Sequence, residues 1–155
     1  MRNKAAKTPT GGLFWLLAIL LVAPACGGDQ TPVIDVTGPT IVGFFPPLSE
    51  EELQRTPSVT QALAFLQFAL NDAKACLATL APTIRMEATS ALKFRLDGSR
   101  QTIEFPQEEG LWVGVVLLQP GQEPRVIHAS AGPASLQQVL ASASAEYFAA
   151  PECAP

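Results

Sequence analysis

The stretch Pro57–Leu80, PSVTQALAFLQFALNDAKACLATL, has the clearest periodic pattern in this chain. Its apolar residues recur every three or four positions and fall within an arc of about 120° on a helical wheel, which is typical of a helix with one buried face. Thr56 can cap this helix, and Pro57 suits its first position because the amide there needs no partner. The predicted buried stripe consists of Val59, Ala62, Leu63, Leu66, Ala69, Leu70, Ala73, Leu77 and Leu80.

Two residues of this helix outside the stripe are of functional interest. Cys76 falls on its flank, and Phe68 falls on the polar side. An exposed Phe68 could mark a surface for a partner. Single exposed apolar side chains are also common on soluble domains, so this position has two interpretations.

A short apolar stretch precedes the helix. Residues Thr40–Phe45, TIVGFF, are mostly β-branched or aromatic and lie between prolines, which predicts a buried strand. The spacing of Ser49 and Glu52 predicts a capping box, in which each side chain bonds the backbone amide of the other. Carboxylates in a first turn also suit the helix dipole, so the acidic residues that follow Ser49 need no catalytic explanation.

An alternating pattern follows the helix. From Ile84 to Leu96 every even position except Ser90 is apolar, which predicts one strand with one face in water. Asp97-Gly98 then predicts a tight hairpin. A two-residue turn would place Leu92 opposite Ile103 and continue the apolar face.

The polar face of this hairpin predicts a basic strip, which consists of Lys93, Arg95 and Arg100, with Arg85 nearer the start of the strand. In an otherwise acidic protein the basic strip could bind an anionic headgroup or polysaccharide. The alternative is an ordinary solvated strand face, since alternation alone accounts for the pattern.

The last part of the chain predicts a second hairpin and a helix. Leu111–Leu118, LWVGVVLL, is continuously apolar, as expected of a central strand that is covered on both faces. Gln119–Gln122, QPGQ, suits a type II turn, and Arg125–Ala129 would return as the partner strand. Pro133 can open the closing helix, whose predicted buried face holds Leu136, Val139, Leu140, Ala143 and Tyr147.

The sequence offers few groups for catalysis. His128 is the only histidine, so no cluster has the spacing of zinc ligands. It has no acidic or nucleophilic partner in a motif, which favours a structural role. Neither a Gly-x-Ser-x-Gly elbow nor a phosphate-binding loop occurs. We therefore expect no catalytic residue, no metal site and no cofactor.

The start of the chain resembles the signal peptide of a bacterial lipoprotein. An uninterrupted apolar run, Leu13–Ala23, follows a basic start and precedes the first acidic residue. A helix that spans a membrane needs about 20 apolar residues, and this run is shorter. The alternative to a cleaved signal peptide is an uncleaved membrane anchor. Ala23-Pro24-Ala25-Cys26 is similar to a lipobox in its last two positions and departs from it in the first two.

This resemblance implies that Cys26 becomes the lipidated first residue of the mature protein. Ordinary secretory cleavage after a small residue is the alternative. Gly27, rather than aspartate, follows the cysteine, which favours the outer membrane over the inner membrane. We expect a signal peptide at residues 1–25, a lipidated tether at 26–38 and a single domain at 39–155, in the bacterial cell envelope. Val33, Ile34 and Val36 of the tether could add an edge strand.

Export would change the net charge of the mature protein and the number of cysteines that can pair. Without the three basic residues of the signal peptide, seven Lys or Arg face fourteen Asp or Glu, and the net charge of about −7 disfavours nucleic-acid binding. Lipidation of Cys26 leaves two cysteines, and an even pair in an exported protein favours a disulfide. The predicted disulfide joins Cys76 and Cys153, and a buried free Cys76 is the alternative.

The order of the predicted elements resembles a thioredoxin-like fold. Residues 41–45, IVGFF, followed by a helix start, are similar to the strand that delivers the redox motif of that family. Residues 114–136 are similar to its final hairpin, glycine and helix. The resemblance implies an α/β (α+β) domain with a central mixed sheet of about four to six strands, a long helix after the first core strand, and a C-terminal helix.

The same resemblance places Ser49 and Glu52 at the positions of the family's Cys-x-x-Cys motif, where neither residue can form a disulfide. No proline lies at residues 110–113, where the family's cis-proline would fall. Thiol-disulfide exchange at the usual place is therefore not expected.

The expected function is that of a membrane-anchored lipoprotein with a non-catalytic thioredoxin-like domain, which acts as a protein-binding or scaffold module. The partner would be another envelope protein, and Phe68 and the basic strip are the candidate surfaces. One alternative is an envelope enzyme that uses Cys76 or Ser49, although no motif pairs Ser49 with His128 as a base. A purely structural envelope protein is the other alternative.

Overall fold

The computed structural model describes residues 32–55, 57–105, 113–129 and 133–153. All of these residues belong to one unit of the chain, which spans residues 31–155. The predicted signal peptide, the predicted lipidation site Cys26 and the predicted cap residue Thr56 lie outside the described residues.

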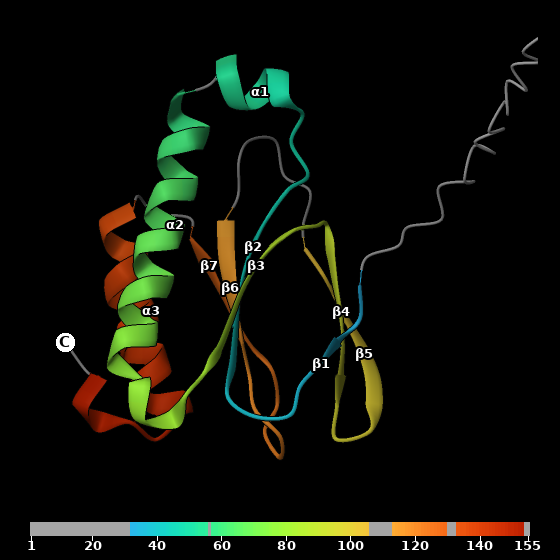
Figure 1. Cartoon of the computed structure of the whole chain (residues 1–155), viewed down its shortest axis with the longest axis vertical. Coiled ribbons are helices and arrows are strands. Elements are labelled where there is room, and N and C mark those ends of the chain that lie inside the picture. The colour runs from blue at the N-terminus through green and yellow to red at the C-terminus, as the bar shows by residue number, and fades with distance from the viewer. Residues whose placement is uncertain (1–31, 56, 106–112, 130–132, 154–155) are drawn as a thin grey trace, which may run out of the picture. The chain divides into compact units, whose positions relative to one another are not determined.

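The described residues form a central sheet with helices on one face and a smaller sheet on the other (Figure 1). The strands are β1 (Ile34–Asp35), β2 (Thr40–Phe45), β3 (Thr83–Ala88), β4 (Ala91–Leu96), β5 (Ser99–Glu104), β6 (Val113–Leu118) and β7 (Arg125–Ala129). The α-helices are α1 (Glu50–Arg55), α2 (Pro57–Cys76) and α3 (Pro133–Tyr147), and short 3-10 helices follow α2 at Ala78–Leu80 (η1) and α3 at Pro151–Cys153 (η2).

The central sheet has the strand order β3-β2-β6-β7. β2 runs parallel to β3 and antiparallel to β6, and β7 runs antiparallel to β6. α1 and α2 lie in the crossover between the two parallel strands, α3 follows β7, and α2 packs against α3. The expected fold class is therefore confirmed: a mixed α/β domain with a long helix after the first core strand and a C-terminal helix, compatible with a thioredoxin-like fold.

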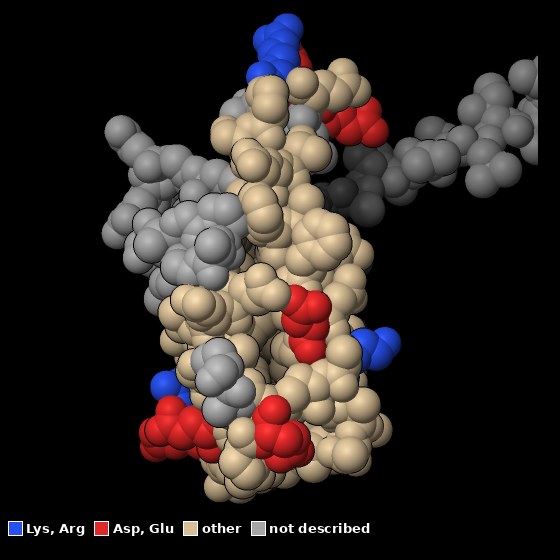
Figure 2. Space-filling model, turned by 90° about the vertical axis from the view of Figure 1, so that its left-hand side faces the viewer, with Lys and Arg blue, Asp and Glu red and all other residues tan. Residues whose placement is uncertain are grey.

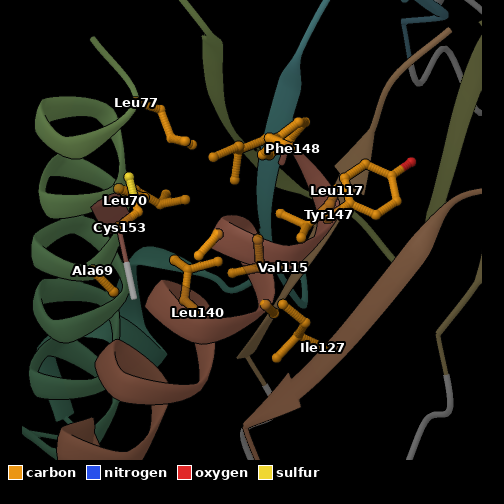
Figure 3. Packing of buried hydrophobic residues seen from close by; sticks show 14 of the residues in the cluster. Ala69, Leu70, Leu77, Val115, Leu117, Ile127, Leu140, Tyr147, Phe148 and Cys153 are labelled. Carbon is orange, nitrogen blue, oxygen red and sulfur yellow. The ribbon is translucent and has the colours of Figure 1, made fainter. Parts of the chain in front are cut away.

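The central sheet is buried on both faces. All residues of β6 are buried, as its continuous apolar sequence predicts. Because successive side chains of a strand point to opposite faces, β2 and β6 contribute to two separate cores. The larger core lies between the sheet and the helices, and Figure 3 shows part of it around Val115 and Leu140. It includes Ile41, Leu66, Ala69, Leu70, Leu77, Val113, Val115, Leu117, Leu136 and Leu140.

The second core lies between the central sheet and the smaller sheet, whose strand order is β1-β4-β5. Phe44 of β2 and Phe94 of β4 are both fully buried in it. The ring of Phe44 stacks on Phe105, with centroids 3.5 Å apart and planes inclined by 7°. Gly114 of β6 pairs with Phe44 in the sheet, and this glycine leaves the space that the ring occupies.

Both predicted turns are confirmed. Asp97 and Gly98 have φ angles of 51° and 78°, the left-handed conformations that a two-residue type I′ hairpin requires. The hairpin register pairs Leu92 with Ile103, as predicted. In the turn between β6 and β7, Gly121 has a φ of 79° at the third position, where a type II turn favours glycine.

The prediction of a single strand from Ile84 to Leu96 is wrong, because the structure divides it into β3 and β4, which lie in different sheets. The break falls at Thr89, whose hydroxyl donates to the Ala91 carbonyl at 2.7 Å and accepts from the Ala91 amide at 3.0 Å. This local turn takes the chain out of the central sheet. Met86, predicted on the apolar face, is 37% exposed because β3 lies at the edge of its sheet.

Within the predicted tether, the edge strand that the sequence allows is present as β1, at the edge of the smaller sheet. Ile34 and Val36 are buried, and the Val36 amide donates to the Arg95 carbonyl at 3.0 Å. Part of the predicted tether therefore packs with the domain. Burial corrects two further predictions. Leu80 is 38% exposed because it lies in η1, where α-helical spacing no longer holds. Val139, at the margin of the predicted face of α3, is 49% exposed.

Candidate functional site

Ser49 and Glu52 lie at the start of α1, directly after the loop that leaves β2. The Glu52 carboxylate accepts hydrogen bonds from the backbone amide and the hydroxyl of Ser49, both at 2.7 Å. In return, the Glu52 amide donates to Ser49 Oγ at 3.2 Å, which completes the predicted capping box. Both exposed side chains are thus engaged in closing the helix.

These hydrogen bonds also affect the charge of Glu52. The backbone amide of Ser49, and then its hydroxyl, hold the pKa of Glu52 below the usual value because both donors favour the ionised carboxylate. An ionised Glu52 is unsuited to donating a proton near neutral pH. Its neighbour Glu51 pairs with Arg55 at 2.6 Å on the same short helix. These residues therefore build a helix cap and not an activated nucleophile.

The two cysteines that were expected to pair lie at bonding distance. Cys76 ends α2 and Cys153 ends η2, with sulfur atoms 1.96 Å apart and Cα atoms 5.6 Å apart. Cys153 is buried in the larger core, and Figure 3 shows its sulfur beside α2. The bond fastens the end of the chain to the long helix. A bonded Cys76 has no thiolate, which a cysteine nucleophile requires.

The outward side of α2 carries the exposed Phe68, as the helical pattern predicts, and this side chain is 65% exposed. From Pro57 to Asn71 the helix has no Lys, Arg, Asp or Glu. The first charged residue is Asp72, whose carboxylate accepts a hydrogen bond from the side chain of Gln137 in α3. We define the α2 face by its exposed residues Gln61, Ala64, Gln67, Phe68 and Asn71.

Figure 2 shows the side of the molecule on which the helices lie. Charged side chains gather at its top and in its lower half, and the described surface between them is uncharged. A partner could cover such a surface without removing an ion from water, which is costly for an unpaired charge.

The basic strip lies on the outer side of the smaller sheet. The register places Arg95 directly opposite Arg100, and Lys93 follows the same side of β4. The Arg95 guanidinium contacts the carboxylate of Asp35 in β1 at 2.8 Å. Arg85, which the sequence placed near the strip, does not join it because β3 belongs to the central sheet.

One contact between two turns was not predicted. The Asp97 carboxylate accepts a hydrogen bond from the Gly121 amide at 2.9 Å, which ties the hairpin of the smaller sheet to the β6–β7 turn. The two turns border an open hollow of about 520 Å³. It is lined by Leu96, Asp97, Ser99, Gln101, Gly121, Gln122, Glu123 and Pro124.

His128 lies on β7, where the backbone register pairs it with Gly114, and its side chain is outside what the structure describes. Within the described part of the chain, no three His, Cys, Asp or Glu residues gather closely enough to hold a metal ion. The helices that the structure describes also lack the combination of length and apolar character that crossing a bilayer requires.

Comparison with known proteins yields no relative: no family model, no curated protein and no solved structure matches this chain.

Proposed function

We propose that this chain is a membrane-anchored lipoprotein of the cell envelope, whose thioredoxin-like domain binds another protein and carries out no redox reaction. The observation that carries the proposal is the α2 face, an exposed helical surface with one large aromatic side chain and no charge before Asp72, at its end.

The composition of the α2 face suits a protein partner. The centres of protein interfaces are enriched in aromatic residues and depleted of charged ones. Covering Phe68 would remove a large apolar side chain from water, which favours association. The amides of Gln61, Gln67 and Asn71 can form hydrogen bonds with a partner, and none of them carries an ionic desolvation cost.

The start of α1 supports binding over an exchange reaction. Exchange needs a thiolate that attacks a disulfide sulfur, and the positions that resemble the redox motif hold Ser49 and Glu52 in a cap. The carboxylates of Glu50, Glu51 and Glu52 would also disfavour any anion that formed there. Cys76 is at bonding distance from Cys153 and offers no free thiol.

The lipid anchor enters the proposal from the sequence, through the basic start, the short apolar run and Cys26. Two acyl chains on one residue suffice for stable attachment to a bilayer. Attachment would confine the domain near envelope proteins and raise the effective concentration of both partners.

Photo-crosslinking in cells tests the proposal. A photoreactive amino acid at Gln61, beside Phe68 on the α2 face, should give a discrete adduct with an envelope protein. The same amino acid at Gln122, in the exposed β6–β7 turn, should not give this adduct.

A pair of variants makes the test specific for the aromatic side chain. Phe68→Ser should reduce the adduct at Gln61 by roughly tenfold or more, as expected when a central aromatic contact is lost. Val139→Ser, which removes an exposed apolar side chain from α3, should leave it unchanged. An adduct that forms equally at Gln122, or that does not depend on Phe68, would contradict the proposed function.

A further inference from the structure

The outer side of the smaller sheet differs in charge from the rest of the domain. Side chains alternate along β4, so that Leu92 and Phe94 enter the second core while the basic strip faces outward. This outer side carries three cations and two anions, a net charge of +1. They are Lys93, Arg95, Arg100, Asp35 and Glu104.

The remaining described residues carry the opposite charge, with four cations and nine anions and a net charge of −5. The cations are Arg55, Lys74, Arg85 and Arg125, and the anions are Glu50, Glu51, Glu52, Asp72, Glu87, Asp97, Glu123, Glu146 and Glu152. The outer side of the smaller sheet therefore has a positive net charge, whereas the rest of the described domain has a negative one.

Arg95 and Arg100 form a cross-strand pair of like charge. Such pairs destabilise a sheet, so this pair acts against the fold. Asp35 offsets part of the repulsion through its contact with Arg95 at 2.8 Å, and both partners of that ion pair are substantially exposed. An external anionic surface would stabilise both arginines at once.

The chain enters the domain at the edge of this same sheet. β1 pairs with β4 in parallel, and Asp35 lies next to Arg95. From Cys26 to Pro32, the first described residue, there are six residue steps, which can span at most about 21 Å. A lipid on Cys26 would therefore hold the edge of the smaller sheet close to the bilayer.

We infer that the basic strip docks on the anionic headgroups of the membrane into which the lipid on Cys26 inserts. This inference rests on the proposed lipid anchor. The central sheet separates the two cores, so a domain that lies on the bilayer by its smaller sheet turns the α2 face away from the lipid. Docking thus presents the proposed protein-binding surface to the partner.

Vesicles that carry the natively exported, lipidated protein test the inference. A fluorescent probe at Thr102→Cys reports on the outer side of the smaller sheet, and a probe at Gln61→Cys reports on the α2 face. With spin-labelled lipid as quencher, vesicles that contain phosphatidylglycerol should quench the Thr102 probe several-fold more than the Gln61 probe. In vesicles of phosphatidylcholine alone, where only the lipid anchor acts, the difference in quenching between the two probes should be several-fold smaller. High salt should reduce the difference in anionic vesicles in the same way, because salt screens exposed charges.

Charge variants identify the residues responsible. A basic side chain near an anionic surface shifts the docked-to-undocked ratio by about fivefold, so Arg100→Gln should reduce this ratio by that factor. Arg125→Gln is the matched control, because it removes a cation from β7, outside the basic strip. Quenching that is insensitive to Arg100→Gln, or equally sensitive to Arg125→Gln, would overturn the inference.

Flotation separates failure of the anchor from failure of docking. The protein should float with phosphatidylcholine vesicles through its lipid alone. If it does not float, the lipid anchor is wrong and the inference falls with it. If it floats but the difference in quenching between the two probes is no larger in anionic vesicles than in phosphatidylcholine vesicles, docking is wrong while the anchor and the α2 face stand.

Discussion

Ser49 and Glu52 close the first turn of α1 on each other: the Glu52 carboxylate accepts both polar hydrogens of Ser49, and the Glu52 amide donates to Ser49 Oγ in return. The resemblance to the thioredoxin family places its two redox cysteines at these positions. The spacing that would bring two sulfur atoms together brings a hydroxyl and a carboxylate together in this chain. In this chain the pair serves as a helix cap, and neither side chain can form a disulfide.

Removing the hydroxyl should weaken this cap. In Ser49→Ala we predict that the pKa of Glu52 rises only part of the way to its usual value, because the backbone amide, the larger cause, is kept. NMR titration of the Glu52 carboxyl measures this shift.

The lowered pKa also makes the stabilising effect of the cap depend on pH. The cap stabilises α1 fully above the usual pKa of a glutamate, and this stabilisation is lost as the pH falls through the folded-state pKa of Glu52. Ser49→Thr keeps a hydroxyl and should retain the wild-type pKa, and an unchanged pKa in Ser49→Ala would contradict the cap.

Features that depend on neighbouring residues were predictable from the sequence. The capping box, the Asp97-Gly98 hairpin and the buried strand β6 each rest on residues a few positions apart, so their patterns are complete within one segment. The exposure of Phe68 was predictable for the same reason, because the helical stripe alone determines which side faces water.

The assignment of strands to two sheets was not predictable in this way. An alternating period is the same in either sheet, so the pattern from Ile84 to Leu96 continues across the turn at Thr89. Ser90 was the single interruption, and it lies in that turn. The contact of Arg95 with Asp35 was also hidden, because the two residues are 60 positions apart.

Gly114 and Gly43, which lie in the central sheet, should differ in how well they tolerate substitution by alanine. An added Cβ at Gly114 would lie 2.3 Å from the Phe44 ring and 2.8 Å from the Ile127 carbonyl oxygen, and neither can move easily inside a packed core. Gly114→Ala should therefore lower the free energy of unfolding by about 1–3 kcal/mol or more in denaturant titrations. Gly43→Ala should cost less, because its closest neighbour is a flexible leucine end at 2.7 Å.

The control for this comparison is Gly38→Ala, where nothing lies within 4 Å of the added atom. Its stability should match the wild type. Equal losses for Gly114→Ala and Gly38→Ala would show that the close approach of β6 to Phe44 is incorrect.

The bond between Cys76 and Cys153 should be a large part of the stability of the exported protein. It closes a loop with a sequence separation of 77 residues, for which loop-closure entropy gives about 4.5 kcal/mol. Cys153→Ala should lower the free energy of unfolding by that order, measured by denaturant unfolding without reductant. With reductant present, the wild type should lose most of this advantage. Two reactive thiols in the denatured but unreduced wild type would contradict the bond.

The anchor makes a direct biochemical prediction. In a bacterial host, metabolic labelling with a palmitate analogue should mark the wild type, and Cys26→Ser should remove the label because the acylated thiol is gone. Cys76→Ser serves as the matched cysteine control and should keep the label. A label that survives Cys26→Ser would contradict lipidation at this residue.

A double substitution to cysteine tests whether Ser49 and Glu52 occupy the positions of the redox motif. If the frame is thioredoxin-like at this position, Ser49→Cys combined with Glu52→Cys should place two thiols close enough to oxidise to one disulfide. Quantitative thiol titration before and after mild oxidation measures the bond. Two thiols that stay reduced would show that the positions do not correspond to the redox motif.

The central claim, a thioredoxin-like domain without the redox reaction, is tested most directly by reduction of insulin with dithiothreitol as the electron donor. The natively exported wild type should reduce insulin no faster than buffer, because Ser49 and Glu52 form a cap and Cys76 is held by Cys153. Turnover by the wild type that disappears in Cys76→Ser would contradict the account and identify the protein as a thiol enzyme.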